Sequence, residues 1–468
     1  MPTPEAKELR QVPGSAAPPP KTKQRIRRVV GGLAAMSLLV AGGLVVAVPT
    51  SAAEQKKNYI VVLKDGLVDA GAAAAAQQGS YGFRVSTVYR NAMSGYAATM
   101  TASVAARLAA DPGVDFITVA REFAQPADPG PSNQVAPNWW LRMGGALPGD
   151  GQQREKSSVD VNVAVIDSGI DASHPDLNVR GGVDCSTGSP VKVNPTDKVG
   201  HGTFVAGVIG AKDNDLGVIG AAPGTPLWSA RVVDDAGVIT EEMLICAIDW
   251  VTATRKDTNP DNDIEVANIS IGGPGTETAN CGKGTDPMHY AICRSVKAGV
   301  AYAVAAGNSG QDIAGFVPAT YDEVLAATAI ADFDGKPGDL AAPVCGTEDW
   351  SKVGQVDDHP AYFSNYASTT KDEAHTVAGT GVCVTSTSPG GVYGVAHGTS
   401  FASPAVAGSV ALCISEGACG GSGEEVMSQF LELTAAYNQT NSGFGFEGDP
   451  SRPIDGKYYG NLAQVAGY

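Results

Sequence analysis

The segment at residues 396–412 reads AHGTSFASPAVAGSVAL and places a serine at the start of a run of small and apolar residues. The run at 402–412 predicts a buried helix, with Pro404 accommodated in its first turn. Ser400 then stands at the helix N-terminus, where Gly398 lets the backbone come close to a ligand. Backbone N–H groups at such an end favour negative charge, which suits a nucleophile that attacks a carbonyl. Gly-Thr-Ser is equally typical of an ordinary helix cap.

The stretch before this segment alternates predicted strands with predicted helices. Residues 159–166 are rich in β-branched side chains, as expected for a strand buried on both faces of a parallel sheet. Further strands are predicted at 227–233, 266–271, 301–305 and 324–329, and helices are predicted to begin near His201, Glu241 and Met288. This alternation predicts a doubly wound α/β domain, with a mostly parallel sheet flanked by helices and ligands bound beyond the carboxyl ends of the strands.

A carboxylate follows the first of these strands. Asp167 comes directly after residues 159–166, so we expect it at the carboxyl edge of the sheet. Structural aspartates are also common at strand ends. Asp171 and Asp176 are nearby competitors, and each also fits a surface position or a calcium ligand.

A histidine opens one of the predicted helices. His201 lies in a glycine-flanked turn before the apolar run at 204–211, and it is the one histidine of six in such a position. A serine nucleophile needs an imidazole to take its proton and a carboxylate to orient that imidazole. Asp167, His201 and Ser400 supply these three groups, in one of the chain orders in which such triads occur.

The loop at 305–310 reads AAGNSG and follows a predicted strand. It offers the amide of Asn308 as a donor to an oxyanion, which an acyl-transfer site also requires. By itself, Asn-Ser-Gly is also a turn signal.

Composition limits the class of protein. The chain has 468 residues, 43% hydrophobic and 17% charged, which indicates a large globular protein with two or three units. From Ala124 onward it has 18 basic and 41 acidic residues, a net charge of −23 that argues against nucleic acid as a partner.

All eight cysteines lie in this acidic part, and none forms a C-x-x-C pair, so zinc or thioredoxin-like chemistry has little support. Disulfides fit an exported chain. The pairs Cys281–Cys293 and Cys413–Cys419 are expected because their loops are short, and buried thiols are the alternative.

The N-terminal 53 residues are typical of an export signal. A basic cluster at 21–28 precedes an uncharged apolar run at 29–48 and small residues at 51–53, which is the pattern of a signal peptide. An uncleaved anchor remains an alternative because the apolar run is long enough to span a bilayer. Arg27-Arg28 is a weak twin-arginine signal.

The next segment predicts a small α+β unit. Strands are expected at 58–64, 84–89, 95–100 and 114–120, and helices at 71–78 and 103–110. The order β-α-β-β-α-β is the ferredoxin-like arrangement. Residues 126–135 are rich in Pro, Gly and small polar residues, and they predict a linker open to cleavage.

Together these motifs resemble a known family. DSGID from Asp167, HGTFVAG from His201, NISIGG from Asn268, AAGNSG from Ala305 and GTSFASP from Gly398 are similar to the five landmark motifs of the subtilisin-like serine proteases. They occur in the family's order and cover the chain from about Asn138 to its end. The unit at 57–123 resembles the family's inhibitory propeptide, a folding chaperone whose tail, here 114–123, is expected in the active site. Residues 133–141 resemble the start of the proteinase K-like branch.

The resemblance implies a role for each motif. Asp167 would orient His201, His201 would act as general base and then acid, and Ser400 would attack. Asn308 and the Ser400 N–H would hold the oxyanion. Substrate backbone would pair with one wall of the specificity pocket, formed by Ser270, Ile271, Gly272 and Gly273. The loop after a neighbouring strand would form the other wall, with Ala305, Ala306 and Gly307.

These expectations describe a secreted, extracellular, monomeric endopeptidase made as a self-processed precursor. Its expected parts are a signal region at 1–53, a propeptide at 54–123, a maturation region at 124–137 and a peptidase domain at 138–468. Its expected partners are protein or peptide substrates and its own propeptide. The chemistry needs no cofactor, and structural calcium fits the Asp-rich loops although no EF-hand spacing appears. A peptide-binding pseudoprotease and a membrane-anchored processing or scaffold protein are the alternatives.

The chain departs from the family pattern in four places. His397 stands where the family usually has Ser or Asn, and we expect it to be a solvent-facing turn residue. Phe401 replaces the common Met and removes an oxidation-prone sulfur. Residues 378–380 read AGT in place of Ala-Pro-Gly, and residues 333–360 are longer and more acidic than the family pattern. These differences affect the loops and leave the triad intact.

Overall fold

The computed structural model describes residues 55–64, 66, 69–123, 130–132, 137–145, 159–193, 195–214, 216–466 and 468. The predicted signal peptide at 1–53 lies outside this part of the chain, as does most of the maturation region expected at 124–137. None of the helices in the described ranges has the length and apolar character needed to cross a bilayer.

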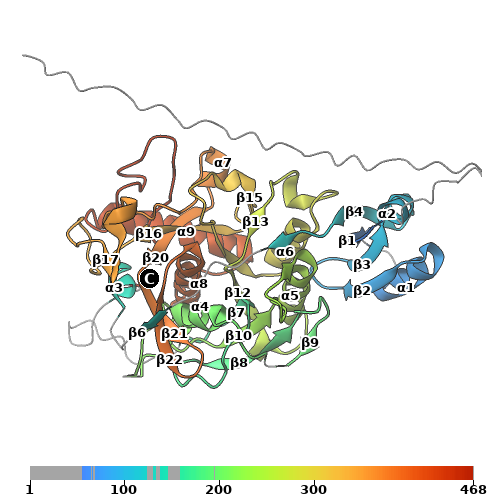
Figure 1. Cartoon of the computed structure of the whole chain (residues 1–468), viewed down its shortest axis with the longest axis horizontal. Helices are drawn as coiled ribbons and strands as arrows, with labels where there is room; N and C mark the ends of the chain where they lie inside the picture. The colour runs from blue at the N-terminus through green and yellow to red at the C-terminus, as the bar shows by residue number, and fades with distance from the viewer. Residues whose placement is uncertain are drawn as a thin grey trace, which may run out of the picture. The chain divides into compact units, whose positions relative to one another are not determined.

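The N-terminal unit is a four-stranded antiparallel sheet with two helices (Figure 1). Its elements are β1 (Lys56–Leu63), α1 (Ala70–Tyr81), β2 (Arg84–Tyr89), β3 (Gly95–Thr101), α2 (Ala102–Leu108) and β4 (Val114–Val119). The strand order β2-β3-β1-β4 confirms the predicted ferredoxin-like arrangement. Asp69 and Thr101 cap the two helices by accepting backbone N–H groups of their first turns.

The central strand β1 is buried on both faces, but by different partners. Tyr59, Val61 and Leu63 lie in the core of the N-terminal unit itself. Ile60 and Val62 alternate with them, point to the other face and belong to the large core of the C-terminal domain. One face of this small sheet therefore packs into the core of the C-terminal domain.

The C-terminal domain is built on a nine-stranded sheet of order β19-β16-β14-β12-β7-β10-β8-β9, with β20 also paired to β16. The strands are β7 (Asn162–Asp167), β8 (Val179–Asp184), β9 (Val191–Lys192), β10 (Leu227–Arg231), β12 (Ile264–Ile269), β14 (Ala301–Ala305), β16 (Leu325–Ala331), β19 (His359–Pro360) and β20 (Thr376–Val382). Only β9 and β19 pair antiparallel, so the predicted fold class is confirmed. The strand order reverses between β7 and β12, and ligands of doubly wound sheets bind at such a reversal.

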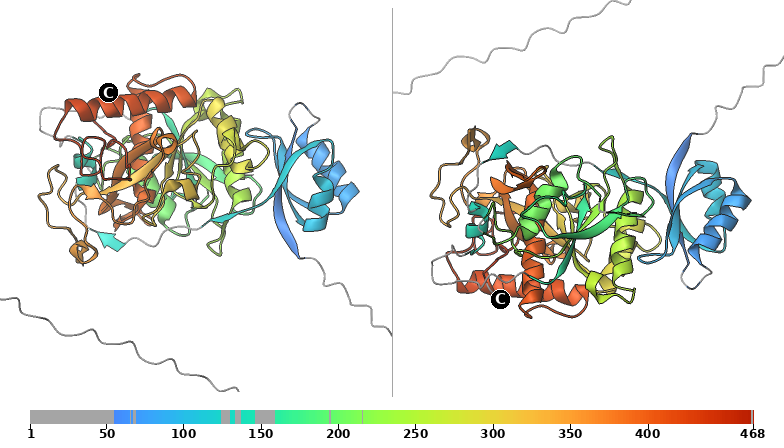
Figure 2. Two further views of the ribbon diagram at one scale, coloured as in Figure 1. Left: turned by 90° about the horizontal axis from the view of Figure 1, so that it is seen from above. Right: turned by 90° about the horizontal axis from the view of Figure 1, so that it is seen from below.

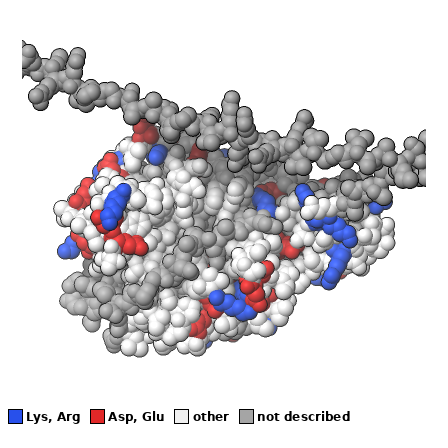
Figure 3. All heavy atoms as spheres, in the orientation of Figure 1, with Lys and Arg blue, Asp and Glu red and all other residues white. Residues whose placement is uncertain are grey.

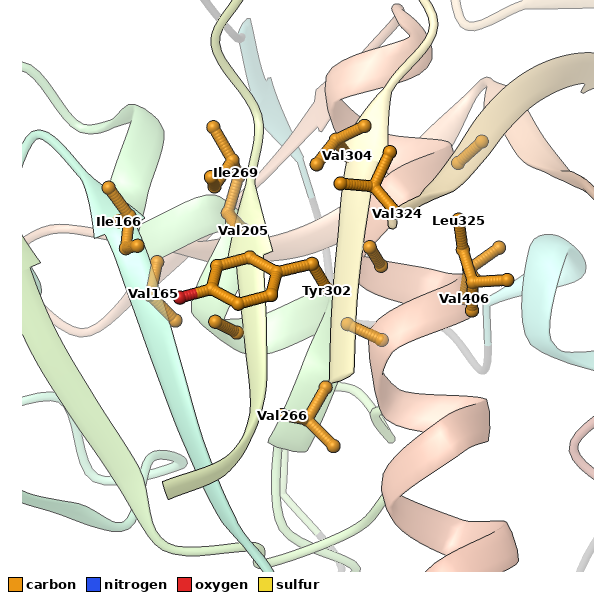
Figure 4. Packing of buried hydrophobic residues seen from close by; sticks show 14 of the residues in the cluster. Val165, Ile166, Val205, Val266, Ile269, Tyr302, Val304, Val324, Leu325 and Val406 are labelled. Atoms are coloured by element: carbon orange, nitrogen blue, oxygen red, sulfur yellow. The ribbon is translucent and has the colours of Figure 1, made fainter. Parts of the chain in front are cut away.

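Helices cover both faces of this sheet. α4 (His201–Gly210) and α8 (Thr399–Ser415) pack together on one face, and α5 (Glu241–Thr254) and α6 (Pro287–Lys297) pack together on the other (Figures 1 and 2). α9 (Gly423–Thr440) contacts both α6 and α8. Figure 4 shows the core between them, where Val406 of α8 and Val205 of α4 lie among strand residues such as Ile269. This double cover fixes the carboxyl edge of the sheet in place.

Helix α8 begins earlier than the run at 402–412 predicts. It starts at Thr399, so Pro404 lies inside the helix, and the expectation that it falls in the first turn is wrong. Proline has no N–H to donate to the carbonyl of Ser400, four residues before it. The hydroxyl of Ser270 donates to that carbonyl over 2.7 Å, so a side chain that follows β12 replaces the missing helical hydrogen bond.

Short elements complete the described chain. They are β5 (Glu122–Phe123), β6 (Gly130–Ser132), α3 (Asn138–Arg142), β11 (Ile239–Thr240), η1 (Pro260–Asn262), β13 (Gly273–Pro274), η2 (Asn280–Gly282), η3 (Ile313–Gly315), β15 (Phe316–Val317), β17 (Val344–Cys345), β18 (Glu348–Asp349), η4 (Trp350–Val353), α7 (Thr370–Glu373), β21 (Val384–Ser388) and β22 (Val392–Ala396). β6 pairs with β22, so three residues of the linker expected at 126–135 lie in a strand. The other residues of that linker are outside the described ranges.

Disulfides link all eight cysteines. The expected pairs Cys281–Cys293 and Cys413–Cys419 are confirmed, and the alternative of buried free thiols is wrong. The structure adds two pairs with longer loops, Cys185–Cys246 and Cys345–Cys383.

On the face in Figure 3, the visible acidic and basic side chains lie among each other, separated by uncharged residues.

Candidate active site

Asp167 and His201 contact each other at the carboxyl end of β7. His201 Nδ1 lies 2.9 Å from Asp167 Oδ1 and 3.0 Å from Oδ2, and both side chains are buried. Burial disfavours the imidazolium, but the charge and hydrogen bond of Asp167, with the charge of Asp197, outweigh it and raise the pKa of His201 above its ordinary value. The carboxylate therefore orients the ring and leaves Nε2 facing away from it.

A second buried carboxylate, which the sequence analysis missed, shapes the turn before His201. Asp197 Oδ1 accepts the N–H of Gly200 and the hydroxyl of Ser168, while Oδ2 accepts the N–H and the hydroxyl of Thr203. Asp197 thus caps the start of α4 and fixes the backbone on both sides of the imidazole. No local signal marked this role, because a capping side chain is expected directly before the helix, where Gly200 stands.

Ser400 lies in the first turn of α8, beside this pair. Its neighbour Phe401 packs on the imidazole of His201, with ring centroids 5.4 Å apart. Ser400 Oγ donates to the carbonyl oxygen of Ser270 at 3.2 Å, and within the described ranges His201 Nε2 is buried without a hydrogen-bond partner. The N-cap of α8 is Gly398, which has no side chain, and Thr399 and Ser400 are already helical, so the interpretation of Gly-Thr-Ser as an ordinary side-chain cap is wrong.

The predicted oxyanion donor lies at the same helix end. Asn308 Oδ1 accepts both the N–H and the hydroxyl of Thr399, each at 2.9 Å. Thr399 Oγ1 also accepts the N–H of Gly307 at 3.0 Å, so the loop after β14 is bonded to α8 one residue before Ser400. Because the amide oxygen is used in this way, the NH₂ group faces Gly398, where a Cβ would lie 3.4 Å from it. Thr399 thus sets the orientation of the Asn308 amide.

The two expected pocket walls flank an aromatic ring that the sequence analysis missed. A Cβ at Gly272 would lie 2.3 Å from Phe316 Cε1, and a Cβ at Gly307 would lie 3.0 Å from the same atom. Only glycine at both positions leaves room for this half-buried ring of β15. The other wall residues are arranged around it: Ser270 bonds to Ser400, Ile271 is buried, Gly273 pairs with Val317, and Ala305 and Ala306 are buried at the end of β14.

The segment after β4 runs along the C-terminal domain, while residues 114–119 form β4 of the N-terminal sheet, so the tail expected at 114–123 begins later than predicted. β5 pairs antiparallel with β11, in the register Phe123 to Ile239 and Glu122 to Thr240. Arg121, just before β5, donates its backbone N–H to the carboxylate of Glu241 at 2.8 Å. The tail of the N-terminal unit thus adds a strand to an edge of the larger domain.

The inserted residues 333–360 lie against the turn before Ser400. His397 packs on Trp350 with ring centroids 4.4 Å apart, and its Nε2 lies 3.2 Å from Glu348 Oε2. Its Nδ1 accepts the N–H of Cys383 at 3.0 Å. The side chain is 22% exposed, so the expected solvent-facing position is wrong. Burial lowers the pKa of His397, although Glu348 opposes the shift.

A buried acidic cluster lies near the base of this insertion. One carboxylate oxygen from each of Asp332, Asp334 and Asp357 falls within 4.8 Å of the others. Asp332 Oδ2 is buried without a hydrogen bond in the described chain, and Arg142 Nε is 3.7 Å away and donates to Asp358. Burial raises the pKa of Asp332 to about 8, against opposing contributions that include Arg142. Carboxylates in such excess over buried cations fit a divalent metal with a preference for oxygen ligands.

The two earlier calcium candidates are used differently. Asp171 accepts hydrogen bonds from Ser173 and from the N–H of Gly390. Asp176 accepts from the N–H of Val218 and the hydroxyl of Tyr393. Neither aspartate joins a cluster of metal-ligating side chains within the described ranges.

Comparisons with known proteins agree with this geometry. Residues 158–446 match the subtilase family, and residues 58–119 match the peptidase inhibitor I9 family. Subtilisin NAT of Bacillus subtilis subsp. natto and subtilisin E of Bacillus subtilis (strain 168) are each 34% identical over 328 residues, which cover 68% of this chain and 70% of theirs. Subtilisin of Bacillus pumilus is 36% identical over 262 residues, which cover 55% of this chain and 78% of its own.

A buried Asp-His pair beside a serine, at the strand reversal of a parallel sheet, is the arrangement of a serine hydrolase. The chain belongs to the subtilase family and is a serine endopeptidase of the subtilase type. The N-terminal unit is its I9-type inhibitor propeptide, so the protein is a protease precursor.

Proposed function

We propose that the protein is a secreted serine endopeptidase that matures by cutting its own chain and hydrolyses peptide bonds through an acyl-enzyme. The observation that carries the proposal is the convergence on one helix end of three groups far apart in sequence. The Asp167–His201 pair packs against Phe401, and Asn308 bonds to Thr399, so both flank Ser400. These are the groups that acyl transfer requires.

In the proposed mechanism, the hydroxyl of Ser400 leaves the carbonyl of Ser270 and attacks the substrate carbonyl carbon. His201 Nε2 takes the hydroxyl proton while Nδ1–H donates to Asp167, which stabilises the imidazolium. The Asn308 amide and the Ser400 N–H hold the oxyanion, and the helix N-terminus adds favourable charge. His201 then protonates the leaving amine, and water releases the acyl group by the same steps.

Substrate would bind as an added strand in the groove that the propeptide tail lines. The support is β5, which already pairs with β11 as an extended chain. Ser270, Ile271, Gly272 and Gly273 would form one wall of the specificity pocket, and Ala305, Ala306 and Gly307 the other. Phe316 would line the space between the walls, since it contacts glycines of both.

Maturation of the full-length protein tests the proposal. Wild-type chain should give an exported product whose N-terminus lies between Phe123 and Asn138, whereas Ser400→Ala should accumulate as precursor. N-terminal sequencing of the secreted product and gel analysis measure both. Ser409→Ala is the matched control, because Ser409 lies on the same helix and its hydroxyl donates to the carbonyl of Ala405 one turn earlier. Normal self-cleavage of Ser400→Ala would reject the assignment.

The same measurement separates the alternatives. A pseudoprotease would leave the wild-type chain uncut, and a membrane-anchored protein would keep residues 29–48 and stay in the membrane fraction. Size-exclusion chromatography of the product tests the expected monomer.

We also propose that Asp332, Asp334 and Asp357 hold a structural calcium ion. The support is the buried Asp332 Oδ2, which lacks a hydrogen bond within the described chain, and the small number of cations nearby. Chelation should lower the melting temperature of the wild type by several degrees, because a ligand that binds only the folded state stabilises it. Asp332→Asn should lose this response, while the exposed Asp235→Asn should keep it. An unchanged wild-type melting temperature, or an Asp332→Asn variant that responds like wild type, would reject the site.

A further inference from the structure

The propeptide fills a small acidic pocket of the peptidase domain with one guanidinium group. Arg121 Nη2 donates to Glu241 Oε1 at 2.8 Å, to Asp286 Oδ1 at 2.9 Å and to the hydroxyl oxygen of Tyr321 at 3.0 Å. The backbone is bonded too, since Glu241 N–H donates to the Arg121 carbonyl at 2.7 Å. The contact is therefore a recognition of arginine by shape and charge.

The pocket is built by the peptidase domain alone. Glu241 is the first residue of α5, and Asp286 caps α6 by accepting the N–H of His289 at 3.0 Å. Tyr321 donates to Asp286 Oδ2 at 2.7 Å, so two of the walls are bonded to each other independently of the propeptide. A Cβ at Gly275 would lie 2.9 Å from Arg121 Nη1, so this glycine leaves space for the guanidinium.

The acidic side chains of the pocket favour a bound cation. Glu241 and Asp286 are 1% and 5% exposed, and within the described ranges Arg121 is the one cation paired with either of them. Burial raises the pKa of Glu241, and Arg121 opposes that shift. When maturation removes the propeptide, two carboxylates on a preformed wall lose their counter-charge, which is costly for a group out of water.

The pocket lies where a side chain of a bound substrate is expected. Arg121 lies two residues before Phe123, which pairs with Ile239, and all of these propeptide residues precede the region where maturation is expected. A substrate that replaces the tail on β11 would place the equivalent side chain in the same pocket, on the N-terminal side of the bond that is cut.

We propose that Glu241, Asp286 and Tyr321 form a subsite of the mature enzyme that selects arginine in substrates. The selected arginine stands two residues before the substrate residue that pairs with Ile239. This inference rests on the proposed function. Arginine is favoured over lysine because the guanidinium is planar and extended: Nη2 reaches Glu241, Asp286 and Tyr321, while Nη1 occupies the space beside Gly275. The propeptide is then a substrate-like occupant, and its release opens the subsite.

The test compares peptides on the matured wild-type protein. One internally quenched peptide carries residues 115–140 of this chain, and two others differ only by Gln or Lys at position 121. We expect kcat/KM to be about 10- to 100-fold higher with Arg than with Gln, mostly through KM, with Lys between them. Mass spectrometry must show the same bond cut in all three. The ratio should shrink in high salt, because charge recognition is screened.

Two variants of α5 test whether Glu241 causes the preference for arginine. Glu241→Gln should bring the Arg-to-Gln ratio close to one, while Glu242→Gln, the same change at the next residue of α5, should keep the wild-type ratio. If Glu241→Gln does not mature, the wild-type peptides and the salt series still decide. Equal kcat/KM for Arg and Gln in the wild type would overturn the subsite. Cleavage of none of the peptides would reject the proposed function instead, and the affinities of the same peptides, measured by fluorescence anisotropy, would then confirm or overturn the pocket separately.

Discussion

Two polar networks in this molecule differ in where their partners come from. Around His201, the hydrogen bonds between described residues join Asp167, Asp197 and neighbouring groups of the peptidase domain. At the propeptide contact, Asp249 of α5 accepts the backbone N–H groups of Arg90, Asn91 and Ala92. Each bond of that second set has one partner in each domain. Removal of the propeptide therefore leaves the first network complete and breaks the second.

The comparison shows how one chain can hold a catalytic site and its inhibitor together. The catalytic groups are bonded to elements that also build the core, so they are ordered before maturation. The propeptide contact uses the carboxylates of Asp249 and Glu241, which accept hydrogen bonds from propeptide groups. The contact also has an apolar component, since Ile60 and Val62 of the propeptide lie in the core cluster of the peptidase domain.

The largest effect is expected from Asn308, which, like the network around His201, is bonded within the peptidase domain. Asn308→Ala should lower kcat about 10²- to 10³-fold, a range known for an oxyanion-hole asparagine in subtilisin rather than deduced from these distances. Folding should be nearly intact, so circular dichroism and kcat of the matured variant are measured together. Gln311→Ala, on the same loop, is a suitable control. A near-wild-type kcat would remove Asn308 from the oxyanion site.

A smaller effect is expected from the second network, and it should depend on maturation. In a Ser400→Ala precursor, Asp249→Ala should lower the free energy of unfolding by about 2 kcal/mol, because hydrogen bonds to a charged acceptor are lost. The same change in the matured enzyme should have a much smaller effect, since those partners are gone. Denaturant unfolding of both forms measures the difference. Equal losses in precursor and matured protein would contradict the division between the two networks.

The smallest expected effect is a shift in the pH at which kcat/KM falls. His201 must be neutral to accept the serine proton, and its pKa is raised above the ordinary 6.5 by Asp167 and Asp197. As pH falls, kcat/KM should therefore begin to drop above pH 6.5, with Asp197→Asn moving the midpoint to lower pH. Rates of a small peptide substrate across pH 4 to 9 measure this. A rate unchanged from neutral pH to pH 4 would contradict the role of His201 as the base.

Much of the site could be predicted because its residues stand at the ends of strongly patterned elements. Asp167 ends a β-branched strand, and His201 and Ser400 each begin an apolar helix, so the parallel sheet brings them to one edge. Pro404 was placed in the wrong turn because Thr399 and Ser400 are already helical, and no local pattern marks that start. Phe316 and Arg121 were missed because each contacts residues more than 40 positions away in sequence, Gly272 for Phe316 and Glu241 for Arg121.

The sequence by itself determined the order of the strands and helices, the type of chemistry and the division into propeptide and peptidase, because these follow from local periodicity and short motifs. Only the tertiary structure decided that Ser270 replaces the hydrogen bond that Pro404 cannot make, that Thr399 orients Asn308, and that Glu241 and Asp286 surround Arg121. Such contacts form at distances of about 3 Å between segments whose separation is set by packing of the whole core, which no local pattern specifies.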